Sequence, residues 1–219
     1  MFVAIVPAYN EEKNIGSVVR SLFRHVDRVV VIDDCSQDRT VAEAEAAGAV
    51  VLAHEINRGQ GAALETGHGY ARQLGATYVI HFDGDGQFSV DDIAPALEHL
   101  KKNQADVLLG SRFLDGRSNV PYSKKYFLHP IAKIINRLFG GLYLSDVHNG
   151  FRILSGRALD HIVINQDRMA HATEIPYLVR KHRLPYVEFP VQVVYKEYGQ
   201  SGLSGFNVIK DLFLDKFIR

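Results

Sequence analysis

The sequence contains one cysteine, Cys35, among 219 residues, so no disulfide can form within the chain. A reducing, cytoplasmic compartment is the expectation for such a chain. An excess of positive charge is also missing, because 25 Lys and Arg residues are balanced by 25 Asp and Glu residues. Proteins that bind nucleic acids normally carry a basic surface, so we expect no nucleic-acid partner.

Long apolar runs are absent as well. No uninterrupted run reaches the roughly 20 residues that cross a bilayer, and the nearest candidate, residues 127–144, contains Lys133 and Arg137. The first residues, MFVAIVPAYNEE, have neither the basic start nor the long apolar core of a signal peptide. We expect a soluble chain, with a peripheral position at the inner face of a membrane left open.

Several motifs that would assign a chemistry are missing. The ten histidines form no H-E-x-x-H motif, and no Cys/His spacing predicts a zinc site. There is no Walker A sequence, and Leu64 stands where the third glycine of a dinucleotide fingerprint would follow Gly59 and Gly61. The glycine-rich segment 54–67, with Arg58, therefore predicts only an anion site at a helix N-terminus, and the signal is weak.

What the sequence does contain is an alternation of β-prone runs with helical patterns. The expected strands are residues 2–7, 28–33, 49–53, 77–82, 106–110, 151–155 and 186–197. The expected helices are 11–26, Asp38 to Gly48, one after Gly61, one from Asp91, 127–140 and 206–218. Residues 114–125 and 198–205 are expected to be flexible loops. This alternation predicts an α/β domain with a mostly parallel sheet and helices on both faces.

The first helical pattern, residues 11–26, has apolar residues at the spacing of one helix face. Asn10 is expected to be its N-cap, with Glu11 and Glu12 in a first turn that favours negative charge. The chain after the first strand should therefore turn directly into a helix.

Two carboxylates follow the apolar run 77–82. Asp83 and Asp85 are one residue apart, and side chains at this spacing lie on the same side of an extended backbone. Carboxylates so close repel each other unless a proton or cation lies between them. Together with Gln87 they suit Mg²⁺ or Mn²⁺, and the glycines on either side of Asp85 leave room for a bulky ligand. The alternative is a solvated Asp-Gly turn in a hairpin.

A second acidic pair, Asp33 and Asp34, ends the run 28–33. Parallel sheets bind ligands at the carboxyl ends of their strands, and a carboxylate there can accept hydrogen bonds from a ribose or a base. The alternative is that Ser36 or Asp38 caps a helix and the acidic pair is merely solvated.

Five motifs occur in order along the chain: VPAYNEE, VIDDCSQDRT, NRGQGAAL, DGDGQF and GSRF. Together they resemble family 2 glycosyltransferases with the GT-A fold, and most closely the dolichyl- and polyprenyl-phosphate sugar synthases and their bacterial relatives. The resemblance extends through SDVHNGFRILS and VVYKEYGQSGLS, so it covers nearly the whole chain. It implies a single domain, 1–219, with a nucleotide-sugar-binding half (1–112) and an acceptor half (113–219).

The resemblance implies a role for each matching residue. The expected nucleotide-sugar contacts are Pro7, Ala8, Tyr9, Glu11, Asp34, Arg58, Gly59, Gln60, Asp83 and Gly84. The expected ligands of Mg²⁺ or Mn²⁺ are Asp83, Asp85 and Gln87. The expected catalytic residues are Asp85, Arg112, Asp146 and Glu174. The expected acceptor contacts are Lys124, Lys125, Asn149 and Lys196.

The implied reaction is an inverting, metal-dependent transfer from a UDP- or GDP-linked sugar. A lipid-phosphate acceptor is already an anion and needs no general base, whereas a sugar hydroxyl would need a carboxylate such as Asp146 or Glu174. The absence of a Q-x-x-R-W motif favours a polyprenyl phosphate. Many relatives carry an arginine in the loop after GSR, whereas the nearest basic residues here are Lys124 and Lys125, with Arg117 earlier. A lysine offers the acceptor phosphate a point charge without the planar fork of an arginine.

Two further classes of protein are also compatible with parts of the sequence. A sugar-1-phosphate nucleotidyltransferase has a similar sheet, but its glycine-rich loop after the first strand is replaced here by PAYNEEKN. A non-catalytic module could bind a nucleotide, or bind a partner through the amphipathic segments 127–140 and 206–218. If the enzyme works at a membrane, a surface helix or a small membrane protein is the expected anchor, because the chain stops at Arg219.

Overall fold

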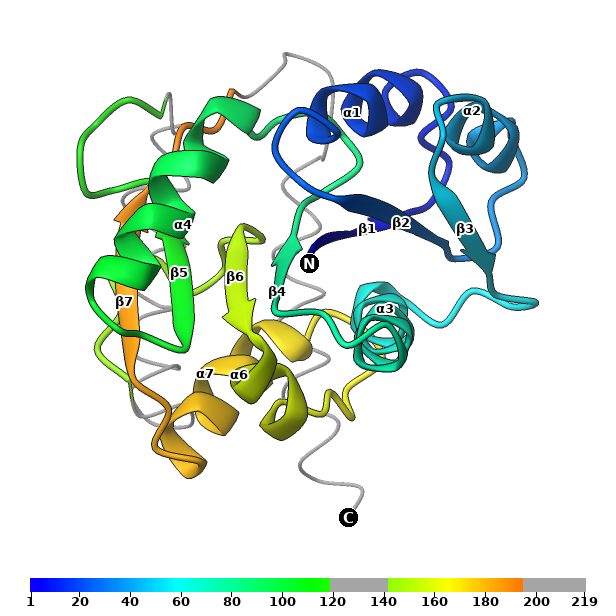
Figure 1. The fold of residues 1–219 in the computed structure, drawn as a ribbon. Coiled ribbons are helices and arrows are strands. Elements are labelled where there is room, and N and C mark those ends of the chain that lie inside the picture. Colours follow the sequence, from blue (N-terminus) through cyan, green and yellow to red (C-terminus); the bar gives the residue numbers. More distant parts are fainter. Residues whose placement is uncertain (119–141, 195–219) are drawn as a thin grey trace, which may run out of the picture.

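The computed structural model describes residues 1–118 and 142–194. In this part of the chain one sheet of seven strands has the order β3-β2-β1-β4-β6-β5-β7 (Figure 1). The strands are β1 (Phe2–Ala8), β2 (Arg28–Asp33), β3 (Val50–Ala53), β4 (Tyr78–His81), β5 (Val107–Ser111), β6 (Arg152–Ser155) and β7 (Tyr186–Pro190). Each expected strand is present, although the last one ends at Pro190 and not at residue 197.

The sheet is parallel except at β6. β1 pairs in parallel with β2 and β4, β2 with β3, and β5 with β7, whereas β6 runs antiparallel to both β4 and β5. The expectation of a mostly parallel sheet is confirmed. Because β6 is reversed, it begins at the edge where β4 and β5 end. The residues that precede β6 therefore meet the loops that follow those strands.

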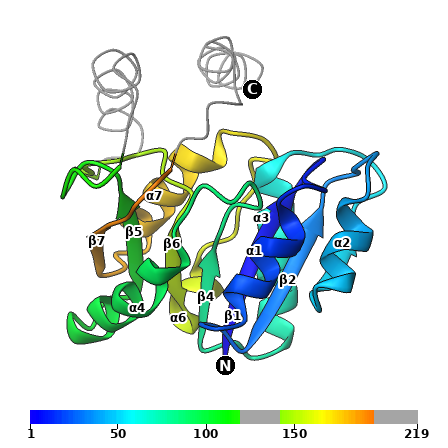
Figure 2. The same ribbon diagram turned by 90° about the horizontal axis from the view of Figure 1, so that it is seen from above.

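Helices cover both faces of the sheet, as the sequence predicted (Figures 1 and 2). One face carries α1 (Ile15–Leu22), α2 (Thr40–Ala46) and α4 (Ile93–Lys102), which follows the 3-10 turn η1 (Val90–Asp92). The other face carries α3 (Gln60–Gln73), α6 (Gly156–His161) and α7 (His171–Lys181). The last two were not predicted. Within the described residues, no helix is both long enough and apolar enough to cross a membrane.

Two apolar cores lie on either side of the sheet, because side chains alternate along a strand. In β1, Val3 and Ile5 face α3, whereas Ala4 and Val6 face α1. Helix α3 packs especially close: a Cβ atom at Gly67 would lie only 2.4 Å from Cγ2 of Ile5. This close approach fixes the first turn of α3 beside the carboxyl ends of β1 and β2.

The prediction for the first helix was wrong at its start. Helix α1 begins at Ile15, and Asn10 has a left-handed backbone with φ of 55°. Asn10 donates its backbone N–H to Oγ of Ser36 (2.8 Å), and its side-chain oxygen accepts the backbone N–H of Gln37 (2.8 Å). Oγ1 of Thr40 accepts the backbone N–H of Glu11 (2.7 Å). The loop after β1 is thus bonded to the loop after β2, and this long-range pairing outweighs a local N-cap.

The expected loop 114–125 is bonded in the part that the structure describes. Arg117 forms an ion pair with Asp92 (2.9 Å) and donates a hydrogen bond to the carbonyl oxygen of Pro190 (2.9 Å). Ser118 donates to the carbonyl oxygen of Val191 (2.9 Å). These contacts join residues 117 and 118 to η1 and to the chain after β7, and the expectation of flexibility stays a prediction. The rest of that loop, and the elements expected at 127–140, 198–205 and 206–218, lie outside the described residues.

Candidate active site

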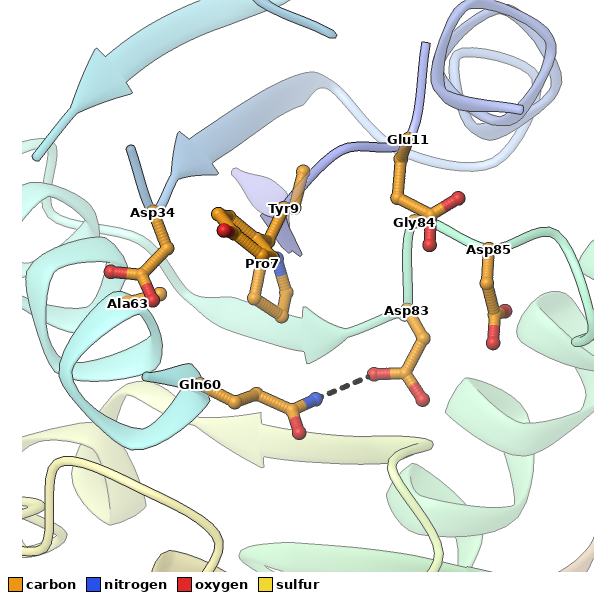
Figure 3. A pocket seen from close by; sticks show the side chains of 10 residues that line it. Pro7, Tyr9, Glu11, Asp34, Gln60, Ala63, Asp83, Gly84 and Asp85 are labelled. Atoms are coloured by element: carbon orange, nitrogen blue, oxygen red, sulfur yellow. Dashed lines mark hydrogen bonds between the residues drawn. The ribbon is translucent and has the colours of Figure 1, made fainter. Parts of the chain in front are cut away.

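A cavity of about 270 Å³ opens at the carboxyl ends of β1, β2 and β4 (Figure 3). We call it the edge cavity. It is lined by Pro7, Ala8, Tyr9, Glu11, Asp34, Gln60, Ala63, Asp83, Gly84 and Asp85. All of these except Ala63 were singled out from the sequence. Residues from the carboxyl ends of β1, β2 and β4 and from the first turn of α3 therefore meet where a parallel sheet is expected to bind its ligand.

Asp83 and Asp85 point from the end of β4 toward the same side of the cavity (Figure 3). Asp83 accepts a hydrogen bond from Nε2 of Gln60 to its Oδ1 (2.9 Å), and Asp85 accepts the backbone N–H of Gln87 (2.9 Å). Burial, followed by the negative charge of Asp85, raises the pKa of Asp83 to about 6. Repulsion from Asp85 thus adds to the effect of burial, and a cation between the two carboxylates would relieve that repulsion.

The donor set at this position fits a hard divalent cation. Mg²⁺ usually takes one or two carboxylates and fills its other positions with water and substrate phosphates. Among the described residues, no group of three or more His, Cys, Asp or Glu side chains is arranged to hold a metal ion. A site built on Asp83 and Asp85 thus needs oxygen atoms from elsewhere. Gln87 is partly buried beside them and stays a predicted third ligand.

The glycines of this loop also have a structural reason. A Cβ at Gly84 would lie 3.3 Å from both Cδ1 of Ile15 and the carbonyl oxygen of Pro7, so this position packs against α1 and β1. Gly86 has a φ of 70°, which glycine adopts readily. Close packing and a turn favour glycine here, and clearance for a ligand stays a prediction. No return strand follows directly, so the hairpin alternative is wrong.

Gly150, in the segment before β6, lies directly against Asp83. A Cβ at this glycine would come within 2.5 Å of Oδ2 and 3.0 Å of Cγ of Asp83. Only glycine allows the backbone of this segment to approach the carboxylate so closely. The reversed strand β6 thus brings the second half of the chain onto the acidic pair.

Asp34 is buried, with 4% of its surface exposed, and so is Asp33 with 2%. The interpretation of this pair as solvated is wrong. The carboxylate of Asp34 accepts the backbone N–H groups of Arg58 (2.9 Å) and Gly59 (2.6 Å) and contacts Nδ1 of His54 (2.9 Å). Asp34 therefore holds the loop before α3 while it lines the cavity, and its contact with a base or ribose stays a prediction.

The loop before α3 also meets the segment before α7. Gly59 caps α3 with a φ of 100°, and a Cβ at Gly61 would fall 1.9 Å from the carbonyl oxygen of Gln166. Arg58 forms an exposed ion pair with Asp167 (3.1 Å). These glycines are required by the second half of the chain, and Arg58 does not line the edge cavity.

Arg112 follows β5 and is held by Asp146, which precedes β6. Nε and Nη2 of Arg112 donate hydrogen bonds of 2.6 and 2.7 Å to the two carboxylate oxygens, and its backbone N–H donates a third of 3.1 Å. Asn149 adds a contact of 3.3 Å to the same carboxylate. Burial opposes ionisation of Asp146, but its hydrogen bonds from Arg112 outweigh burial and hold its pKa below the usual range.

Glu174 lies in the first turn of α7, outside the residues that line the edge cavity. Its carboxylate accepts the backbone N–H groups of Asn165 (3.1 Å) and Gln166 (2.9 Å). This arrangement fixes the loop that packs on the glycines before α3. The predicted acceptor residues Lys124, Lys125 and Lys196 lie outside the described residues.

Sequence reasoning missed a buried polar layer beneath the edge cavity. His68 and His81 contact each other through their Nε2 atoms (2.7 Å), and both rings are buried. Arg152 and His171 are buried close to them. A histidine in the middle of an apolar strand, as in VIHF, was the available signal. The pairing of His81 with Arg152 depends on the antiparallel contact of β4 and β6, which no local pattern predicts.

The chain matches the model of a family described as "Glycosyl transferase family 2" over residues 3–163. A UDP-N-acetylglucosamine–dolichyl-phosphate N-acetylglucosaminyltransferase of Methanococcus voltae is 31% identical over 238 residues, covering 97% of this chain and 94% of that protein. A polyprenol monophosphomannose synthase of Mycolicibacterium smegmatis is 26% identical, covering 96% of this chain and 84% of that protein. Both relatives therefore align with nearly the whole chain.

The fold is also similar to that of solved structures. Glucosyl-3-phosphoglycerate synthase from Mycobacterium tuberculosis, in complex with Mn²⁺, uridine diphosphate and its product, matches with a TM-score of 0.66 at 20% identity. The match covers 94% of this chain and 75% of that chain, and it supports the GT-A fold expected from the sequence. Family model, relatives and fold agree, and the chain belongs to glycosyl transferase family 2.

Proposed function

We propose that this glycosyltransferase transfers a sugar, with inversion, from a UDP- or GDP-linked donor to a polyprenyl phosphate. The names of two relatives support the acceptor, since one is a dolichyl-phosphate transferase and the other a polyprenol monophosphomannose synthase. The edge cavity and its acidic pair support a nucleotide-diphosphate donor. Because such an acceptor resides in a membrane, we expect the protein at the cytoplasmic face as a peripheral protein, with a small membrane protein as a candidate partner.

The observation that carries this proposal is the state of the two candidate bases. Asp146 is buried, engaged by Arg112, and has a lowered pKa, so it is a poor proton acceptor. Glu174 accepts two backbone N–H groups away from the edge cavity. A sugar hydroxyl needs a base within hydrogen-bond reach, whereas a phosphate acceptor carries its own negative charge. The described carboxylates therefore favour a phosphate.

In this proposal each part of the site has one task. Asp83 and Asp85, with Gln87, would hold Mg²⁺ or Mn²⁺, and the bound ion would neutralise the donor diphosphate as it leaves. The residues at the ends of β1 and β2 would flank the nucleoside. Asp146 would orient Arg112 toward the phosphate groups, since a clamped guanidinium is already placed before the substrate arrives.

The test compares acceptors and removes the remaining candidate base. The parent and Glu174→Gln are assayed with UDP- and GDP-linked sugars, Mn²⁺, and either a short-chain isoprenyl monophosphate or a sugar acceptor. We expect transfer to the isoprenyl phosphate only, with the variant within about threefold of the parent. A general base contributes about 100-fold or more. A loss of that size with a hydroxyl acceptor would instead establish transfer to a sugar.

Family membership also bears on the nucleotidyltransferase and on the non-catalytic module. The match to a glycosyltransferase family replaces the nucleotidyltransferase hypothesis. The relatives and structural neighbours are enzymes, which argues against a non-catalytic module. The choice that remains is between a phosphate and a hydroxyl acceptor, and the comparison of isoprenyl phosphate with sugar decides it.

A further inference from the structure

Arg152 is the first residue of β6 and lies beneath the acidic pair. It pairs in register with His81 of β4, two residues before Asp83. Alternation along β6 puts it on the face of Leu154, which packs with α3, α6 and α7. Only 3% of its surface is exposed. The reversed strand thus places a buried guanidinium under the end of β4.

The charge of this guanidinium is not matched by a direct contact. Arg152 makes no side-chain hydrogen bond or ion pair with any residue in the described ranges 1–118 and 142–194. Buried arginines are normally paired, because an uncompensated charge in the interior is costly. Arg112 and Arg117, by contrast, each bind a carboxylate. Arg152 therefore has hydrogen-bond donors to offer to a ligand.

The surroundings of Arg152 leave it positively charged. Burial lowers its pKa to about 10, while the charges of Asp83 and Asp146 oppose this effect, so it stays protonated at neutral pH. Burial lowers the pKa of His171 to about 4, and it also lowers the pKa of His81 well below its usual value. Neither ring therefore adds positive charge beside Arg152.

The balance of charge changes when a divalent cation binds. The charges of Asp83, Asp85 and one divalent cation sum to zero, so the bound cation would offset the electrostatic attraction between Asp83 and Arg152. Asp146 is already neutralised by its ion pair with Arg112. A buried guanidinium whose charge is no longer compensated favours the binding of an anion. A phosphoryl group suits it, because its oxygens can accept hydrogen bonds from the planar guanidinium N–H groups.

We propose that Arg152, whose charge interacts with Asp83 and Asp146, binds a phosphoryl oxygen of a substrate beside Asp83, and that it does so together with the metal at the acidic pair. The proposal rests on the proposed function, which supplies phosphoryl groups from two sources, the donor diphosphate and the acceptor monophosphate. A role for Arg152 as a purely structural counter-charge to Asp83 and Asp146 is the competing explanation.

The experiment compares Arg152→Gln and Arg152→Lys with Arg157→Gln, a matched control. Arg157 lies on α6 with 64% of its side chain exposed. Isothermal titration of the full chain with Mn²⁺ uses three probes: uridine or guanosine diphosphate, inorganic pyrophosphate, and a short-chain isoprenyl monophosphate. Loss of a charged hydrogen bond corresponds to about 10- to 100-fold in affinity. We expect that loss in Arg152→Gln, a smaller one in Arg152→Lys, and none in the control.

The probe that loses affinity identifies the source. If Arg152→Gln binds the nucleoside diphosphate and pyrophosphate more weakly than the parent does, Arg152 contacts the donor. If it binds the isoprenyl monophosphate more weakly, Arg152 contacts the acceptor. A folded Arg152→Gln protein that binds every probe like the parent overturns the role of Arg152 but leaves the proposed function standing. If Arg152→Gln does not fold, the Arg152→Lys variant decides. Affinities equal to those of the parent for every probe would then overturn the proposed role of Arg152. A parent that binds no probe contradicts the proposed function, and the role of Arg152 with it.

Discussion

Nε2 of Gln60 donates a hydrogen bond of 2.9 Å to Oδ1 of Asp83, and so joins the first turn of α3 to the end of β4. A hydrogen bond to the ionised form of a carboxyl group favours that form. Replacing Gln60 with Leu should therefore raise the pKa of Asp83 further and move metal binding to higher pH. Gln73→Leu, an exposed change at the end of the same helix, is the control.

The binding of Mn²⁺ should itself depend on pH through Asp83. Its pKa of about 6 lies above the usual carboxyl value, so the cation must displace a proton at lower pH. Affinity should fall about tenfold per pH unit below pH 6 and level off above it. Titration between pH 5 and 8 measures this. An affinity that is flat across the range would show that Asp83 is not a ligand.

The same shift makes a separate prediction for the metal-free protein. Because folding raises the pKa of Asp83, the folded state retains a proton that the unfolded state has lost. The free energy of unfolding should therefore decline as pH rises from about 4 to 6 and change little above that. Urea unfolding at several pH values measures it, and Asp83→Asn should abolish this component of the slope.

The ion pair between Arg112 and Asp146 should be needed for both fold and activity. In Asp146→Asn the guanidinium loses its charged partner, which should cost about 3 kcal/mol of unfolding free energy. A misplaced Arg112 should lower the transfer rate about 100-fold. Since the pKa of Asp146 is lowered in the fold, the stabilisation is present above its usual value near 3.8 and is lost as pH falls below it. The exposed Asp160→Asn should change neither quantity.

Two glycines of α3 offer a matched pair for stability. Alanine at Gly67 would put Cβ 2.4 Å from Ile5, and overpacking of this kind costs about 1–3 kcal/mol. Alanine at Gly69 meets no atom within 4 Å, and Gly to Ala within a helix stabilises by about 0.5–1 kcal/mol. Chemical denaturation should therefore show a lower free energy of unfolding for Gly67→Ala and a higher one for Gly69→Ala. Equal effects would mean that α3 does not pack on β1 as closely as described.

The parts of the site that follow a strand directly could be predicted from the sequence. A polar cluster after an apolar run identifies a carboxyl end, so the residues after β1, β2 and β4 were found in this way. Asp83 and Asp85 share a side because of the two-residue period of a strand. None of these inferences needs knowledge of which strands are neighbours.

What the sequence could not show depends on contacts between distant segments. Gly150 lies against Asp83, and Arg152 lies in register with His81, only because β6 inserts antiparallel between β4 and β5. Asn10 looked like an N-cap because it directly precedes a helical pattern. Its hydrogen bonds to Ser36 and Gln37 join two loops that are distant in the sequence, and no local pattern shows them. In each case tertiary hydrogen bonding or strand order, which has no local pattern, decides the role of the residue.

The most direct test of the proposed transfer is the product itself. The full chain is incubated with Mn²⁺, a UDP- or GDP-linked sugar and a short-chain isoprenyl monophosphate, and the product is examined by mass spectrometry and NMR. We predict a sugar joined through phosphate to the isoprenyl chain, with an anomeric configuration opposite to that of the donor. A product with retained configuration, or the absence of any sugar joined to the isoprenyl phosphate, would contradict the proposed function.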